Sequence, residues 1–222
     1  MSQGRLMDDN KWQELDRIHA LLPDSEGCGD SEYIVLMNTA ISAISEVADE
    51  GGGLERLIQR FSASRKAVFP RAIAYHLAKR ADKTYYLERT PGGDPDLARL
   101  MITFLERLTS ANEVGMLTNA LNALQYFAWY GGHCPWSETP PVLFAFLQRC
   151  LEWDGKGPIV QEFAVEVTTQ FLVLGWLNQA ITAQSAADLV SRMAKIAQFA
   201  DGLLDGYVME ARTFLEAYSR GT

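Results

Sequence analysis

The sequence predicts an all-α protein formed by one domain, and three observations support this fold class. Apolar residues recur at intervals of three and four along the 222-residue chain, which is the spacing of one helix face. The alternation of period two that marks a half-buried strand does not recur. Turn and capping residues divide the chain into segments of helical length. We expect helices over residues 8–22, 31–50, 54–61, 64–80, 94–109, 110–130, 139–153, 158–176, 185–200 and 203–218.

The first 53 residues are predicted to form a capping pair of helices. The first helix should end at Pro23 and bury one stripe, formed by Trp12, Leu15, Ile18 and Leu22. The second should end at Gly51–Gly53, because only glycine adopts left-handed dihedrals at little cost. Its expected buried stripe is Ile34, Met37 or Asn38, Ile41, Ile44 and Ala48.

The later helices begin at recognisable signals. Ser110 and Glu113 have the spacing of a capping box, in which the two side chains satisfy free amides of the first turn. Proline suits a first turn because its missing N–H is not needed there. The other predicted starts are Asp94-Pro95, Thr139-Pro140, Gly157-Pro158, and Ser185 with Asp188.

These helices form pairs that recur. The first helices of the pairs are expected near residues 54, 94, 139 and 185, at intervals of 40, 45 and 46 residues. The segment 62–80, with Pro70 in its first turns and a mixed basic and apolar pattern, resembles a helix of the HEAT/armadillo family. The helix after Ser110 is similar, with an inward stripe of Leu117, Ala120, Leu121, Leu124 and Ala128.

The resemblance implies a short α-solenoid over residues 54–219, with about four helix-pair repeats stacked on the capping pair 1–53. In this family the second helix of each pair lines the concave surface. An irregular helical bundle has the same amphipathic pattern and stays as the alternative fold.

Several function classes lack their sequence signals. No uncharged apolar stretch approaches the roughly 20 residues of a membrane span, and the polar N-terminus does not read as a secretory signal, so we expect a cytoplasmic protein. The three cysteines lack Cys-x-x-Cys spacing, and the three histidines lack metal-binding spacing, so neither a metal nor another cofactor is expected. These residues are Cys28, Cys134, Cys150, His19, His76 and His133.

Two helix faces are candidate binding surfaces. The outward face of the helix 110–130 carries Asn119, Asn122, Tyr126 and Trp129, although asparagine is a poor residue within a helix. Tyrosine and tryptophan are common interface anchors. The alternative is that both aromatic rings pack against the neighbouring repeat.

The second face lies in a basic segment. Residues 55–89 have a net charge of +6, whereas the whole chain has −8. Within them Arg71, Tyr75 and Lys79 are four residues apart and share one helix face. They could meet an acidic partner or pair with acidic neighbouring helices. Glu162 and Glu166 lie on one face of a later helix, but the Glu-x-x-His motifs of a di-metal site are missing.

We therefore expect a non-enzymatic protein-binding module that uses the concave face of a helical array. Bacterial immunity proteins, which neutralise a toxin by covering its active site, look similar, and an acidic chain suits a basic partner. A second hypothesis is an enzyme whose acid–base groups come from Glu162, Glu166, His76 or His133. A third is a nucleic-acid binder that uses Arg65, Lys66, Arg71 and Lys79, which the overall negative charge disfavours. The partner and the oligomeric state stay open.

Overall fold

The structure is a computed structural model that describes residues 6–23, 31–88, 94–108, 113–131, 141–155, 158–175, 177 and 182–221. Within these ranges the chain forms ten α-helices and one short π-helix, with no strand. The prediction of an all-α fold is confirmed, and each predicted helix has its counterpart. The elements are α1 Leu6–Leu21, α2 Ser31–Ala48, α3 Gly53–Phe61, α4 Val68–Ala81, η1 Asp82–Leu87, α5 Pro95–Arg107, α6 Val114–Gly131, α7 Pro141–Leu151, α8 Ile159–Val173, α9 Ala183–Ala197 and α10 Asp205–Gly221.

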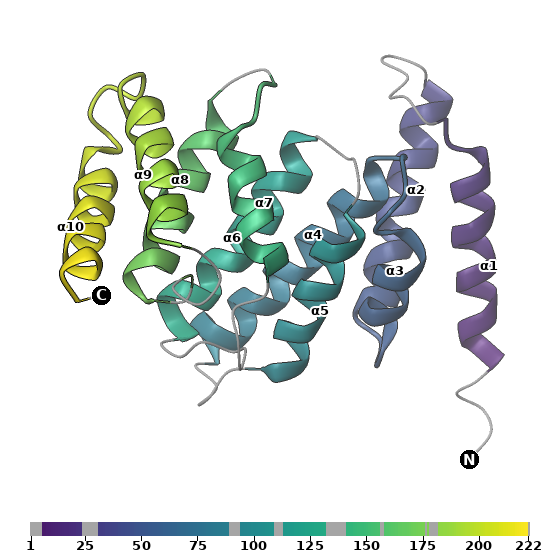
Figure 1. Ribbon diagram of the computed structural model, residues 1–222. Coiled ribbons are helices and arrows are strands. Elements are labelled where there is room, and N and C mark those ends of the chain that lie inside the picture. The colour runs from purple at the N-terminus through teal and green to yellow at the C-terminus, as the bar shows by residue number, and fades with distance from the viewer. Residues whose placement is uncertain are drawn as a thin grey trace.

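The helices lie in two rows (Figure 1). In one row α2 contacts α4, α4 contacts α6, α6 contacts α8, and α8 contacts α10. In the other row α3 contacts α5, α5 contacts α7, and α7 contacts α9. The first helices of the four later pairs begin at Gly53, Pro95, Pro141 and Ala183, which are 42, 46 and 42 residues apart. α1 and α10 lie at opposite ends of the molecule (Figure 1), so contacts follow the order of the chain.

The caps of α6 and α9 differ from the prediction, whereas that of α5 agrees with it. Asp94 caps α5 as expected, because its carboxylate accepts hydrogen bonds from two N–H groups of the first turn. The prediction of a capping box that opens at Ser110 is wrong in its start: α6 begins at Val114, and the Glu113 carboxylate itself accepts from two backbone N–H groups. Ser110 lies outside the described residues. The cap of α9 is Thr182 rather than Ser185, since the Thr182 hydroxyl accepts from the Ser185 N–H at 3.1 Å.

The helix predicted over residues 64–80 starts later and runs further. α4 begins at Val68, so Pro70 lies in the first turn, where its missing N–H costs nothing. Beyond Ala81 the chain continues as the π-helix η1. π-helical turns are rare in proteins overall, and those that occur are often found at functional sites. Here η1 continues α4 and contacts α6.

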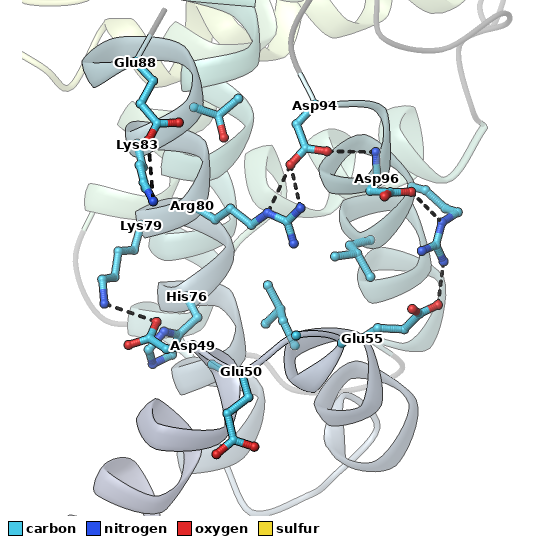
Figure 2. Close-up of a pocket in the computed structure, with 17 residues that line it drawn as sticks. Asp49, Glu50, Glu55, His76, Lys79, Arg80, Lys83, Glu88, Asp94 and Asp96 are labelled. Carbon is cyan, nitrogen blue, oxygen red and sulfur yellow. Dashed lines mark hydrogen bonds and ion pairs between the residues drawn. The ribbon is translucent and has the colours of Figure 1, made fainter. Parts of the chain in front are cut away.

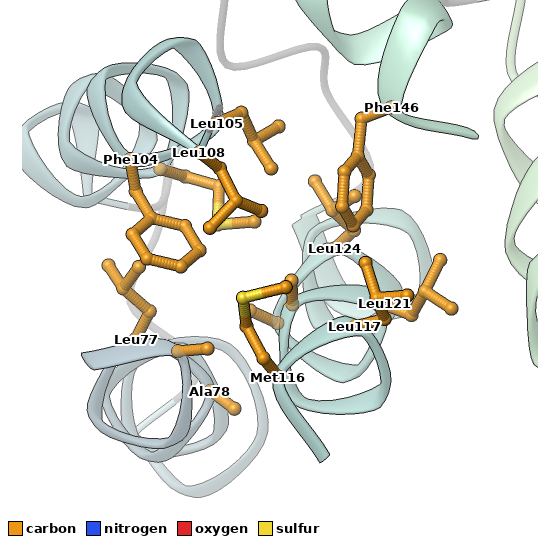
Figure 3. Close-up of a cluster of buried hydrophobic side chains, with 14 of the residues drawn as sticks. Leu77, Ala78, Phe104, Leu105, Leu108, Met116, Leu117, Leu121, Leu124 and Phe146 are labelled. Atoms are coloured by element: carbon orange, nitrogen blue, oxygen red, sulfur yellow. The ribbon is translucent and has the colours of Figure 1, made fainter. Parts of the chain in front are cut away.

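The core lies between the two rows. Figure 3 shows its centre, which lies between α5 and α6. Phe104 of α5, Leu108 directly after α5, and Met116 of α6 meet there. Leu77 of α4 and Phe146 of α7 close the cluster, and all five residues are at most 5% exposed. Burial of each such side chain contributes about 1.5–3 kcal/mol, so the central helices are fixed firmly. No helix in the described part of the chain is long and apolar enough to cross a membrane.

Most predicted buried stripes are confirmed, but that of α2 is partly wrong. Ile44 is buried as expected, together with Ala40 and Val47. Ile34 and Ile41 are instead 45% and 38% exposed. α2 carries apolar residues on several faces, so periodicity alone does not select the face that meets α4. The confirmed stripes are Trp12, Leu15, Ile18 and Leu22 in the first helical segment, and Leu117, Ala120, Leu121, Leu124 and Ala128 in α6.

Candidate binding surfaces

α4 exposes one narrow strip of its surface. Arg71, Tyr75 and Lys79 lie on this strip, and every residue between them is buried. Tyr75 is 53% exposed. The Lys79 ammonium lies 3.5 Å from the carboxylate of Asp49, at the end of α2. The prediction that these three side chains share one face is consistent with this placement.

Arg71 is held by neighbours on both sides of the strip. Its guanidinium lies 3.6 Å from the Glu113 carboxylate, and a second guanidinium nitrogen lies 3.7 Å from the Met37 sulfur on α2. Gly115 of α6 permits this arrangement, because a Cβ at that position would approach Arg71 Cδ to 3.0 Å. Arg71 therefore joins α2, α4 and the start of α6.

The strip predicted on α6 lies next to that of α4, since the two helices contact each other. Asn119, Asn122 and Tyr126 are all half-buried, and Tyr126 also packs against the core. Both the surface role and the packing role considered for Tyr126 are therefore compatible with its position. Trp129 lies on α6, but its side chain is outside the described part of the structure.

α6, α8 and α10 are connected through Glu166. The Gln125 side-chain amide donates a hydrogen bond to the Glu166 carboxylate at 2.7 Å. Burial raises the pKa of Tyr207 on α10, and a hydrogen bond to Glu166 raises it further. Gln125 and Tyr207 were not predicted; Gln125 has no sequence signal beyond being a polar residue within an apolar stripe.

Glu162 borders a different groove. This groove lies between the ends of α7 and α9 and the start of α8, and its walls include Arg192 and Lys195. Arg192 donates a hydrogen bond to Glu152 across it. Although Glu162 and Glu166 share a helix, the described contacts of Glu166 are with α6 and α10 instead.

The basic side chains of residues 55–89 are largely engaged by neighbouring helices. Arg56 stacks over the Trp12 ring at 4.2 Å, and Arg60 donates hydrogen bonds to Asp16. Lys66 donates to the backbone carbonyl of α1 at position 19. Pairing with acidic neighbours, which was one of the two alternatives for this segment, is present at Arg60, Arg71, Lys79 and Arg80.

A polar cleft of about 560 Å³ opens where α2, α3, η1 and α5 meet (Figure 2). Arg80 crosses it from α4 and donates to Asp94 at 2.6 Å (Figure 2). Its cationic residues are Lys79, Arg80, Lys83 and Arg99. Its carboxylates are Asp49, Glu50, Glu55, Glu88, Asp94 and Asp96, which gives a net charge of −2. This cleft was not predicted, because its walls come from separate segments between residues 48 and 100. The spacing of residues 76, 79, 80 and 83 along the helical segment was its only signal in the sequence.

His76 lies at the cleft and is 4% exposed. Burial lowers its pKa, the positive charge of Lys79 lowers it further, and Asp49 acts in the opposite direction. Ser45 donates its hydroxyl hydrogen to the Ile41 carbonyl at 2.9 Å, so its oxygen is left to accept from His76 Nε2 at 3.1 Å. This arrangement of hydrogen bonds assigns the hydrogen of the neutral imidazole to Nε2, which makes Nδ1 the acceptor.

The remaining candidate groups have structural surroundings or lie outside the described residues. His19 packs against the Phe61 and Phe69 rings at 5.2 and 4.8 Å, and its Nε2 lies 2.9 Å from the Ser64 hydroxyl. Cys150 is buried, and burial raises its pKa to about 12. Among described residues no group of three His, Cys, Asp or Glu side chains could hold a metal ion. His133, Cys134 and Cys28 fall outside the described ranges.

No protein-family model, curated protein or solved structure matches the chain. The surfaces described above are therefore the observations on which a functional proposal can rest.

Proposed function

We propose that the protein is a non-enzymatic protein-binding module whose two rows of helices form a short HEAT-like α-solenoid. The support for the solenoid is regularity: contacts follow chain order within each row, and pairs recur at 42 to 46 residues. In arrays of this kind each repeat contacts only its neighbours, and the stacked surface serves binding. The row α2, α4, α6, α8 and α10 then forms the binding surface.

The observation that carries the proposal is the exposed strip of α4 and its continuation on α6. Apart from Arg80, which lines the polar cleft, the rest of α4 is buried, yet the helix presents a half-exposed tyrosine flanked by two basic side chains. The neighbouring α6 strip presents two asparagines and a second tyrosine, a composition with no benefit to helix stability. Tyrosine and arginine are the residue types that most often anchor protein interfaces.

The charge of the chain supports a basic partner. The net charge is −8, and Glu166 of α8 lies beside α6, where it accepts a hydrogen bond from Gln125. A bacterial immunity protein that covers the active site of a basic toxin is one class that fits this charge. Long-range attraction would speed such an association.

The structure supports nucleic-acid binding less than the sequence alone did. Of its four expected phosphate contacts, Lys66 donates to a backbone carbonyl, whereas Arg71 and Lys79 lie beside carboxylates. Phosphate binding would have to break these contacts within an acidic molecule, so we do not favour it.

Site-specific photocrosslinking in cells of the source organism tests the proposal. A photoreactive residue in place of Tyr75 or Asn122 should capture one protein, and excess unmodified protein should compete for it. The Tyr126→Ala protein should compete at least about tenfold less well, since an anchor tyrosine contributes about 2 kcal/mol.

The matched control places the photoreactive residue at Glu106, an exposed position on α5 in the other row. It should capture nothing that competes. Equal capture from Glu106 and Tyr75, or full competition by the Tyr126→Ala protein, would refute the proposed surface.

A further inference from the structure

The ion pairs that line the polar cleft are of two kinds. Arg80 and Arg99 lie 2.6 and 2.7 Å from carboxylate oxygens. The Lys79 and Lys83 ammonium groups each lie 3.5 Å from their partners, Asp49 and Glu88. The four side chains of these two looser pairs are between 53% and 67% exposed. Exposed pairs contribute little free energy, so a ligand can replace them at small cost.

Two buried polar groups beside these pairs have hydrogen-bonding capacity to spare. Thr84 of η1 lines the cleft and is 7% exposed, and its hydroxyl has no hydrogen-bond partner in the described part of the chain. His76 lines the cleft one turn below Lys79, with Nδ1 as an acceptor. Neither atom is among the sealed polar atoms without a partner in the described residues, so both stay open to a ligand in the cleft.

We propose that the cleft binds a small zwitterion of the amino-acid or short-peptide class. The ligand carboxylate binds the Lys83 ammonium and the Thr84 hydroxyl. The ligand ammonium binds the Asp49 carboxylate and His76 Nδ1. Lys79 and Glu88, which lose their partners, are exposed enough to stay hydrated.

The charges of the cleft favour a zwitterion over an ion of either sign. A net charge of −2 disfavours a simple anion, and the row of Lys79, Arg80 and Lys83 disfavours a simple cation. A zwitterion replaces one partner of each sign and leaves the net charge unchanged.

Calorimetric titration of the full chain at low ionic strength tests the proposal with three probes. Glycylglycine carries both charges, N-acetylglycylglycine carries only the carboxylate, and glycylglycinamide carries only the ammonium. Glycylglycine should bind, and each blocked form should bind about tenfold or more weakly, since each loses one charge-assisted contact. No measurable binding of glycylglycine, or equal binding of either blocked form, would overturn the proposal.

Charge-neutralising variants assign the two ends of the ligand. Lys83→Gln should weaken glycylglycine and the acetylated form but leave the amide unchanged, whereas Asp49→Asn should have the opposite pattern. Thr84→Val, which alters no charge, should weaken binding several-fold. Lys195→Gln removes one positive charge on α9 and should have no effect. Loss of binding in Lys195→Gln equal to that in Lys83→Gln would mean a general charge effect and would also overturn the proposal.

This inference goes beyond the protein-binding proposal and can fail independently of it. None of Lys83, Thr84 and Asp49 lies on the α4 or α6 strip. Crosslinking from Tyr75 therefore reports on the first proposal, and titration with dipeptides reports on the second.

Discussion

Thr168 and Thr169 are adjacent in α8 and both fully buried, yet the same substitution should affect stability in opposite directions. The Thr168 hydroxyl has no hydrogen-bond partner in the part of the chain that the structure describes. The Thr169 hydroxyl lies 2.9 Å from the Val165 carbonyl and 3.3 Å from the Tyr207 carbonyl of α10. Valine has nearly the shape and the helix propensity of threonine, so each substitution tests one hydroxyl.

The magnitudes follow from these contacts. A buried hydroxyl without a hydrogen bond costs about 1–3 kcal/mol, so Thr168→Val should raise the free energy of unfolding by about 1–2 kcal/mol. The Thr169 hydroxyl has one hydrogen, so it donates to only one of the two carbonyls at a time. Thr169→Val therefore removes one hydrogen bond, which is worth about 0.5–1.5 kcal/mol. The free energy of unfolding of Thr169→Val should fall by about 1 kcal/mol. The loss stays this small because both carbonyls belong to helices and can still accept the backbone hydrogen bond of their helix.

Equilibrium unfolding in urea measures both changes. The midpoint should move to higher urea for Thr168→Val and to lower urea for Thr169→Val, with the slope of the transition unchanged. Destabilisation by Thr168→Val, or equal changes in the two variants, would refute the assignment of an unsatisfied hydroxyl to Thr168.

Three further predictions concern His76, Cys150 and Gly53. Burial lowers the pKa of His76, so as the pH falls the unfolded chain binds the proton before the folded chain does. The free energy of unfolding should therefore fall as the pH drops from about 7 to 5. Urea unfolding at several pH values should show a smaller pH dependence for His76→Gln. Cys150, whose pKa burial raises to about 12, should react with a thiol reagent only in denaturant, measured with the other two cysteines replaced by serine. A Cβ on Gly53 would lie 1.8 Å from the Val47 carbonyl oxygen, so Gly53→Ala should lower the free energy of unfolding by about 2–4 kcal/mol. Gly206→Ala is its control, since no atom lies within 4 Å of that Cβ; thermal unfolding should show a gain of about 0.5–1 kcal/mol.

The helices were predictable because their signals are local. Pro23 follows the end of α1, and Gly52, with a left-handed φ of 80°, follows the end of α2; both act through the geometry of their own backbone. The α4 strip was equally accessible, because four-residue spacing places Arg71, Tyr75 and Lys79 on one face. The start of α6 was less predictable, since Ser110 and Glu113 can both cap a helix.

The parts that the sequence analysis missed depend on contacts between distant segments. The exposure of Ile34 and Ile41 depends on which side of α2 meets α4, and α2 is apolar on several sides. The cleft depends on Asp49, Lys83 and Asp94 meeting in space. Periodicity carries no information on which charged side chains of different helices become neighbours.

The order of contacts along each row also governs how the chain folds. No helix has extensive contacts with one more than two helices away in sequence, so folding requires no closure of a long loop. The terminal helices α1 and α10 have neighbours on one side only, whereas α4 contacts α2, α3, α5 and α6. Opening should therefore begin at the ends, and backbone amides of α4 should be the last to exchange with solvent. On this expectation the strip of Arg71, Tyr75 and Lys79 lies on the helix that opens last, so its side chains would keep a fixed arrangement while the ends of the array open.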